Sequence, residues 1–130
     1  MEDSEVSEVS DYVYTNYPQS KEELSLFLKR YRDNLIVLRN GSIIGVAFYL
    51  KLEDDTLRAV SGDCKILQDI YRAEELMSER GRNIHFIRVI AEDYKVVLKG
   101  LKEVILKENP KTVSWYKEDM DKIKFIKFRS

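Results

Sequence analysis

Residues 83–117 read NIHFIRVIAEDYKVVLKGLKEVILKENPKTVSWYK, and this stretch decides the fold. It begins with a β-branched run, Asn83 to Ala91, without internal turn residues, which predicts a central, interior strand. The apolar residues then recur at helical spacing until Asn109-Pro110 ends the helix, and Thr112 to Lys117 follows as another strand. This order predicts a right-handed crossover between parallel neighbouring strands.

A three-stranded antiparallel meander is predicted upstream of this crossover. Asn40-Gly41 lies between two apolar runs, Leu35 to Leu38 and Ser42 to Leu50, and marks a tight hairpin turn. Asp54-Asp55 offers a second turn, and we expect it to lead into a third strand at residues 56–60.

Two amphipathic helices are predicted on either side of the meander in the sequence. The first covers residues 21–33, after an S-x-x-E capping box that begins at Ser20. The second covers residues 66–77, and its spacing places Gly81 just past the helix C-terminus.

The two ends of the chain carry weaker patterns. Residues 1–10 alternate acids, Ser and Val with little bulk to bury, so we expect disorder there. Residues 11–17 contain three tyrosines at near-alternating spacing, which fits either a short edge strand or a loop on the core. Residues 122–129 favour a closing strand, whose exposed edge would allow two copies to pair as a homodimer.

Length and composition limit which kinds of protein this chain can be. With 130 residues, of which 44% are hydrophobic, the chain fits a single domain over residues 1–130. The 22 basic and 23 acidic residues nearly cancel, so no overall charge draws the protein to nucleic acid or to membranes. Cys64 is the only cysteine, and we find neither a signal-peptide pattern nor an apolar run of bilayer length. We therefore expect a cytoplasmic protein with a structural thiol.

The order of these elements over residues 20–117 resembles the core of the GNAT-type N-acetyltransferase superfamily. Arg39-Asn-Gly-Ser-Ile-Ile-Gly-Val-Ala47 looks like that family's second and third strands, and Val89-Ile-Ala-Glu-Asp-Tyr-Lys95 looks like its pyrophosphate turn. The strand Ser114-Trp-Tyr116 is similar to those of small phage- and prophage-encoded proteins with reduced versions of the fold. The resemblance implies an α+β fold, with a GNAT-like mixed, mostly antiparallel sheet and a β-α-β crossover near residues 83–117.

The resemblance also implies a cofactor, acetyl-CoA, and a place for it. In that superfamily, backbone amides of the turn and of the helix behind it hold the acetyl-CoA pyrophosphate. The family's Arg/Gln-x-x-Gly-x-Gly/Ala signature is degenerate here, because valine and leucine stand where glycine ordinarily lets a phosphate approach. The implied contacts fall on Ala91, Lys95, Val96, Val97, Leu98 and Gly100.

Two residues are candidates for a catalytic base. The resemblance places Glu92 at the end of the central strand, where a carboxylate could deprotonate a substrate amine. An acidic residue at a helix N-terminus is the structural alternative for Glu92, and we favour it. His85 is the second candidate, and a hydrogen-bonded histidine in the core is again the favoured alternative. No His, Cys, Asp or Glu grouping has the spacing of a metal site, so we expect no metal.

Two classes of function remain open at this point. The resemblance implies an acyl-CoA-dependent N-acyltransferase-like protein that transfers acetyl to an unknown amine acceptor, with the thioester beside Ala91. The other class is a noncatalytic, phage-derived interaction or nucleic-acid-associated module on the same fold. Lysines alternate with aromatic residues over 115–129, which suits single-stranded nucleic acid. Lysine also protects edge strands, and we favour this second interpretation.

Overall fold

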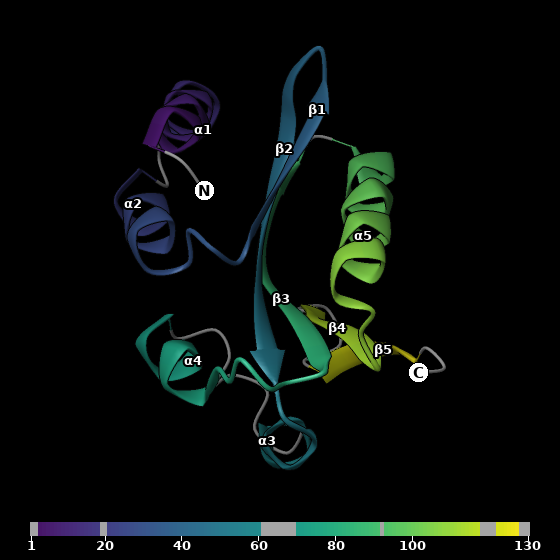
Figure 1. The fold of residues 1–130 in the computed structure, drawn as a ribbon. Helices are drawn as coiled ribbons and strands as arrows, with labels where there is room; N and C mark the ends of the chain where they lie inside the picture. The colour runs from purple at the N-terminus through teal and green to yellow at the C-terminus, as the bar shows by residue number, and fades with distance from the viewer. Residues whose placement is uncertain (1–2, 19–20, 61–69, 92, 118–121, 128–130) are drawn as a thin grey trace.

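The computed structural model describes residues 3–18, 21–60, 70–91, 93–117 and 122–127. Within these residues the chain forms helices and strands in an α+β arrangement (Figure 1). In chain order these are α1 (Asp3–Asn16), α2 (Lys21–Arg30), β1 (Leu35–Asn40), β2 (Ser42–Leu52), α3 (Asp54–Val60), α4 (Ile70–Leu76), β3 (Asn83–Ala91), α5 (Tyr94–Glu108), β4 (Thr112–Lys117) and β5 (Lys122–Lys127).

The strands form one five-stranded sheet in the order β1-β2-β3-β4-β5. The predicted hairpin is confirmed, with Gly41 at its turn in the left-handed region at φ 80°. β3 is the central strand, antiparallel to β2 and parallel to β4, and α5 connects it to β4. The prediction of a mixed, mostly antiparallel sheet with a crossover at residues 83–117 is therefore confirmed.

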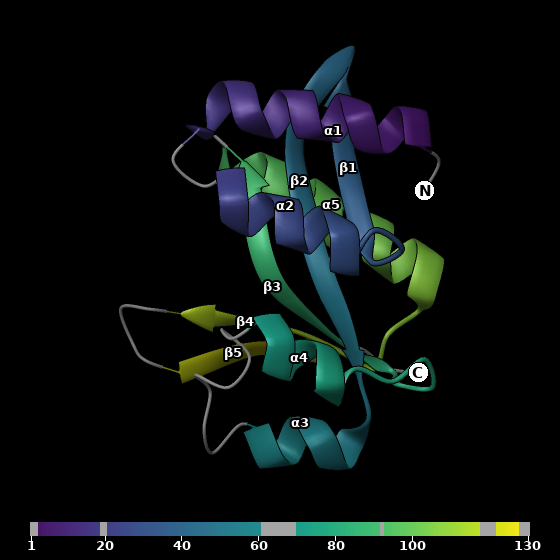
Figure 2. The same cartoon turned by 90° about the vertical axis from the view of Figure 1, so that its left-hand side faces the viewer.

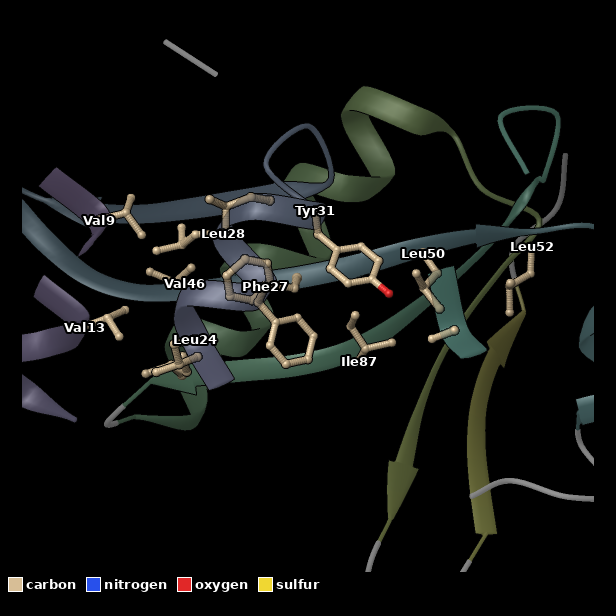
Figure 3. Packing of buried hydrophobic residues seen from close by; sticks show 14 of the residues in the cluster. Val9, Val13, Leu24, Phe27, Leu28, Tyr31, Val46, Leu50, Leu52 and Ile87 are labelled. Atoms are coloured by element: carbon tan, nitrogen blue, oxygen red, sulfur yellow. The ribbon is translucent and has the colours of Figure 1, made fainter. Parts of the chain in front are cut away.

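Helices cover the sheet on both faces, with α1 and α2 on one face and α5 on the other (Figure 1). Alternate residues of β2 supply both cores, because successive side chains of a strand point to opposite faces. On the face of α1 and α2, the Phe27 ring packs against the Phe48 ring at a tilt of 38°, with ring centroids 5.1 Å apart. The same core contains Val9, Val13, Leu24, Val46 and Leu50 (Figure 3). The opposite core contains Tyr49, Ile84, Phe86, Val96 and Val104.

The N-terminal segment differs from our expectation. α1 occupies Asp3–Asn16, where we expected disorder up to residue 10 and then an edge strand or a loop. Val9 and Val13 lie on one helical face and are fully buried. In the sequence, the surrounding small polar residues and acids made this i, i+4 pair difficult to recognise. Burial of the two valines against α2 and the hairpin stabilises the helix.

The segment after β2 is a second correction. Residues 54–60 form α3 and not the third strand of a meander, and β3 takes that place beside β2. Leu57 and Val60 are three residues apart and both are buried, which fits a helix face. Asp54 and Asp55 stand in the first turn, where the helix dipole favours negative charge. The pair of acids is thus a helix start and not a hairpin turn.

The two predicted amphipathic helices are present. α2 begins at Lys21 as expected, while Ser20 of the capping box lies outside the described residues. α4 covers the second half of the helix predicted at residues 66–77. None of the described helices combines the length and the apolar character that a membrane span would need.

Candidate functional site

The N-terminus of α5 is closed by a carboxylate. Asp93 is the N-cap residue, with an extended backbone at φ −131° and ψ 136°. Its side-chain Oδ1 accepts a hydrogen bond from the Lys95 amide at 3.0 Å, and its carbonyl accepts one from the Val96 amide at 3.0 Å. Two of the amides at the start of this helix therefore already have partners.

The structure brings part of the predicted cofactor set together at this turn. Ala91 ends β3 and is half-buried, Lys95 is exposed in the first turn of α5, and Val96 is buried beneath it. Val97 is half-buried and Leu98 is exposed, so both can be reached from solvent at the same turn. Glu92 lies outside the described residues, so its place at the site stays a prediction.

Gly100 is separated from this set. It is buried on the face of α5 that packs on β1, and a Cβ built on it would lie 3.6 Å from Leu38 Cδ1. That separation is an ordinary van der Waals contact, which indicates that the position serves helix packing in this structure.

A glycine in β2 sets how closely α5 approaches the sheet. Gly45 pairs with Ala91 across the β2–β3 ladder. A Cβ on Gly45 would meet Val96 Cγ1 at 2.6 Å and the Ile90 carbonyl oxygen at 3.2 Å. The absence of a side chain at residue 45 therefore allows the first turn of α5 to rest directly on the end of the sheet.

A pocket of about 630 Å³ opens beside this turn. It lies between α1, the beginning of β2 and the N-terminus of α5, at the end of the sheet that carries the hairpin turn. Polar and apolar side chains share its wall. The lining residues are Glu8, Tyr12, Asn16, Ser42, Ile43, Ile44, Asp93 and Val96.

Sequence reasoning missed the α1 side of this pocket. Glu8 and Tyr12 fall in the segments for which we expected disorder or a loop. Their position follows from burial of Val9 and Val13, and that helical spacing was the available signal. A hydrogen-bonded ion pair between Glu8 and Arg39 holds α1 against the hairpin. This hydrogen bond keeps the pKa of the Glu8 carboxyl below its usual range.

The parallel ladder between β3 and β4 is short. It runs from Asn83 paired with Thr112 to Phe86 paired with Trp115. β3 then continues to Ala91, while β4 and β5 turn away from it (Figure 2). Beyond Phe86, the edge of β3 on the β4 side has no strand partner in the described part of the chain.

His85 lies in the core and away from the turn of α5. It is in register with Leu50 and Ser114, so its ring shares the sheet face of α2, opposite to α5. Its Nδ1 forms a hydrogen bond with the Ser114 hydroxyl at 2.9 Å, and the residue has no exposed surface. Burial lowers the pKa of His85 to about 4. This is the hydrogen-bonded core histidine that we favoured over a base.

The site combines two carboxylates, those of Glu8 and Asp93, with polar and aliphatic side chains and the exposed Lys95. Among the described residues, no three His, Cys, Asp or Glu side chains gather as a metal site would require. The site therefore consists of a capped helix N-terminus, a neighbouring pocket and a strand edge that loses its partner.

Comparisons with known proteins bear on the fold. No protein-family model matches the chain, and no curated protein matches its sequence. Among solved structures, it is similar to the GphF GNAT-like decarboxylase in complex with isobutyryl-CoA, with a TM-score of 0.59, 15% sequence identity and 88% of this chain covered. The chain spans 62% of the length of that decarboxylase. The likeness shows that this chain has a GNAT-like α+β fold.

Proposed function

We propose that this protein is an acyl-CoA-dependent N-acyltransferase-like protein, which transfers acetyl from acetyl-CoA to an amine on a single GNAT-like domain. One observation carries the proposal. β4 leaves β3 after Phe86, and the strand edge that no other described strand covers leads to the N-terminus of α5. The solved neighbour with this fold is bound to an acyl-CoA, isobutyryl-CoA, which supports the same ligand class here.

The strand edge suits the pantetheine arm of an acyl-CoA. Peptide N–H and C=O groups need partners, and a strand edge without one can pair with an added extended chain. The pantetheine arm is extended and carries two amide groups. Placed along Ile87 to Ala91, it would pair with β3 where β4 no longer does.

The start of α5 would then receive the pyrophosphate. A helix N-terminus offers backbone N–H groups and the positive end of the dipole. Lys95 and Lys99 are exposed in the first turns and add positive charge. The Asp93 carboxylate opposes the ligand, because it carries negative charge and already occupies the Lys95 amide. We therefore expect acyl-CoA to bind weakly unless that carboxylate is neutralised.

The proposed reaction is transfer of the acyl group from sulfur to nitrogen. With the pyrophosphate at the start of α5, the arm places the thioester at the Ile87 end of the edge, further along β3 than the position beside Ala91 that we expected. The amine nitrogen attacks the thioester carbonyl there, the C–N bond forms, and the C–S bond breaks to release the CoA thiolate. The proton lost by nitrogen passes through water to Glu92 and then to solvent, and the thiolate takes up a proton from solvent. Glu92 keeps its predicted role as the base in this scheme.

Replacing the proposed base tests that role. In Glu92→Gln we expect the acetyl-transfer rate constant to fall about 100-fold or more, since a positioned base contributes about 10²–10⁴. Acetyl-CoA affinity should stay within about twofold or increase, because the change removes negative charge near the pyrophosphate. The measurement is CoA-thiol release against a panel of amines at saturating acetyl-CoA. An unchanged rate in an active protein would remove Glu92 from the mechanism.

A noncatalytic interaction module on the same fold is the second candidate. Asp93 fills part of the proposed anion site, and His85 faces the other side of the sheet. Only four residues, 118–121, separate β4 from β5 in the sequence. β5 forms one edge of the sheet, where a second copy or a nucleic-acid strand would dock in this alternative.

A thermal-unfolding experiment separates the two candidates. A ligand at 100 times its dissociation constant stabilises the folded state by about 2.7 kcal/mol. We expect acetyl-CoA at millimolar concentration to raise the melting temperature. Adenosine 3′-phosphate 5′-diphosphate, which keeps the pyrophosphate and lacks the pantetheine arm, should raise it much less. No shift with any acyl-CoA would favour the noncatalytic candidate.

A further inference from the structure

We infer that the pocket between α1, β2 and α5 binds the ammonium group of an aliphatic amine, with Asp93 as its anchor. The inference rests on the proposed function only where it describes how this amine affects acyl-CoA binding. The binding site itself stands on the chemistry of the pocket wall.

The charges of the wall favour a cation. Glu8 and Asp93 are the charged lining residues, and the described lining contains neither lysine nor arginine. The Glu8 charge is compensated by its ion pair with Arg39. Asp93 forms no ion pair with any described residue, and only its Oδ1 receives a hydrogen bond from one. Its Oδ2 is therefore available to an ammonium group, which carries three donors and forms stronger bonds to carboxylates than neutral donors do.

The remaining wall suits a short methylene chain. Ile43, Ile44 and Val96 provide apolar surface beside the carboxylate. The Ser42 hydroxyl and the Asn16 side chain lie in the same wall and can bond a second polar end. The volume of about 630 Å³ falls within the range of small-molecule sites, about 300–1,000 Å³. Diamines combine a cationic head, an aliphatic stem and a polar end in this size range.

The position beside α5 allows a bound amine to influence acyl-CoA binding. Ile44 precedes Gly45, which pairs with Ala91, and Asp93 follows Ala91 by two residues. An amine held at Asp93 would thus lie beside the start of α5, where the pyrophosphate is proposed. Its positive charge would also offset the carboxylate that repels the pyrophosphate, so we expect amine and acyl-CoA to strengthen each other's binding.

The test is a calorimetric titration of 1,4-diaminobutane into the protein without acyl-CoA at low salt. We expect binding, weakened at high salt, and no binding of 1,4-butanediol, which has the same stem without charge. Asp93→Asn should weaken diamine binding about tenfold, while asparagine keeps the helix cap. Asp55→Asn is the matched control, since it removes one acid from the first turn of α3, outside the pocket, and should change nothing. Asp93→Ser replaces Asp93→Asn if that variant does not fold.

A second titration distinguishes this inference from the proposed function. Asp93→Asn should bind acetyl-CoA several-fold more tightly than the original protein while it binds the diamine more weakly. A general loss of structure would weaken both. Diamine binding without any acyl-CoA binding would uphold the amine site and contradict the proposed function. Failure of the diamine to bind, or equal binding by Asp93→Asn and Asp55→Asn, would overturn the amine site.

Discussion

Acidification from pH 7 to pH 5 is expected to reduce the free energy of unfolding by about 2 kcal/mol through His85 alone. Burial lowers the pKa of His85 in the folded protein to about 4, against an ordinary value of 6.5. Between these two values the unfolded chain binds a proton that the folded chain excludes. The contribution of His85 to the free energy of unfolding is therefore complete above pH 6.5, and it is lost progressively as the pH falls toward 4.

The measurement is urea unfolding of the original protein and of His85→Asn at pH 7, 6 and 5. His85→Asn has a lower free energy of unfolding at pH 7, because asparagine fills the histidine site incompletely. Between pH 7 and pH 5, however, its free energy of unfolding should fall by about 2 kcal/mol less than that of the original protein. Carboxylates that titrate in both proteins cancel in this difference. His85→Leu provides a second neutral side chain if His85→Asn does not fold. Parallel pH profiles would show that His85 titrates normally and is not buried as described.

Substitution of Gly81 by alanine is expected to destabilise the protein by about 3 kcal/mol, at the upper end of overpacking effects. A Cβ on Gly81 would lie 2.5 Å from the Leu52 amide nitrogen and 2.7 Å from the Lys51 carbonyl carbon. These are backbone atoms of β2, so no rotation of a side chain can relieve the overlap. The connection into β3 would have to move away from the sheet.

Gly100→Ala is the matched control, because it adds the same methyl group within a helix. A Cβ on Gly100 would have Leu38 Cδ1 as its nearest contact, at 3.6 Å. Alanine also favours a helix over glycine by about 1 kcal/mol. We therefore expect Gly100→Ala to be neutral or stabilising in the same unfolding assay. Equal effects of the two substitutions would contradict the close approach of the backbone at Gly81.

Gly81 also illustrates how sequence and structure differ. The sequence placed this glycine at the end of a helix, yet α4 ends at Leu76, and the glycine is needed where the chain crosses β2. A glycine can end a helix or can allow two backbone segments to approach each other closely. The local sequence looks the same in both cases, so it does not reveal which role the glycine has. The same holds for Gly45 beneath α5, which only the packed structure explains.

The crossover was predictable because each part had its own periodicity. Asn83 to Ala91 is rich in β-branched residues, and Asn109 with φ 45° ends α5 where the sequence places its stop. The wrong assignments of α1 and α3 concern segments with few apolar residues, whose spacing fitted more than one pattern. Their helical form depends on burial of single residues such as Val9 and Leu57, which is a tertiary effect.

The candidate site was predictable only in part. The resemblance placed the cofactor turn at the end of the central strand, and the structure brings Ala91, Lys95 and Val96 together there. The pocket was not predictable, because its wall combines α1 with a turn far away in sequence. The sequence suggested an acidic helix start at Glu92, and in the structure the next residue, Asp93, is the N-cap of α5.

Amide chemical shifts in solution report whether acyl-CoA lies along the edge of β3 that β4 leaves. Acetyl-CoA titrated into isotope-labelled protein is expected to shift the amides of Ile87 to Ala91 and of the first turn of α5, while α3 and the β1 edge remain unchanged. Absence of shifts at millimolar acetyl-CoA, or shifts confined to other parts of the sheet, would show that acyl-CoA does not bind along β3.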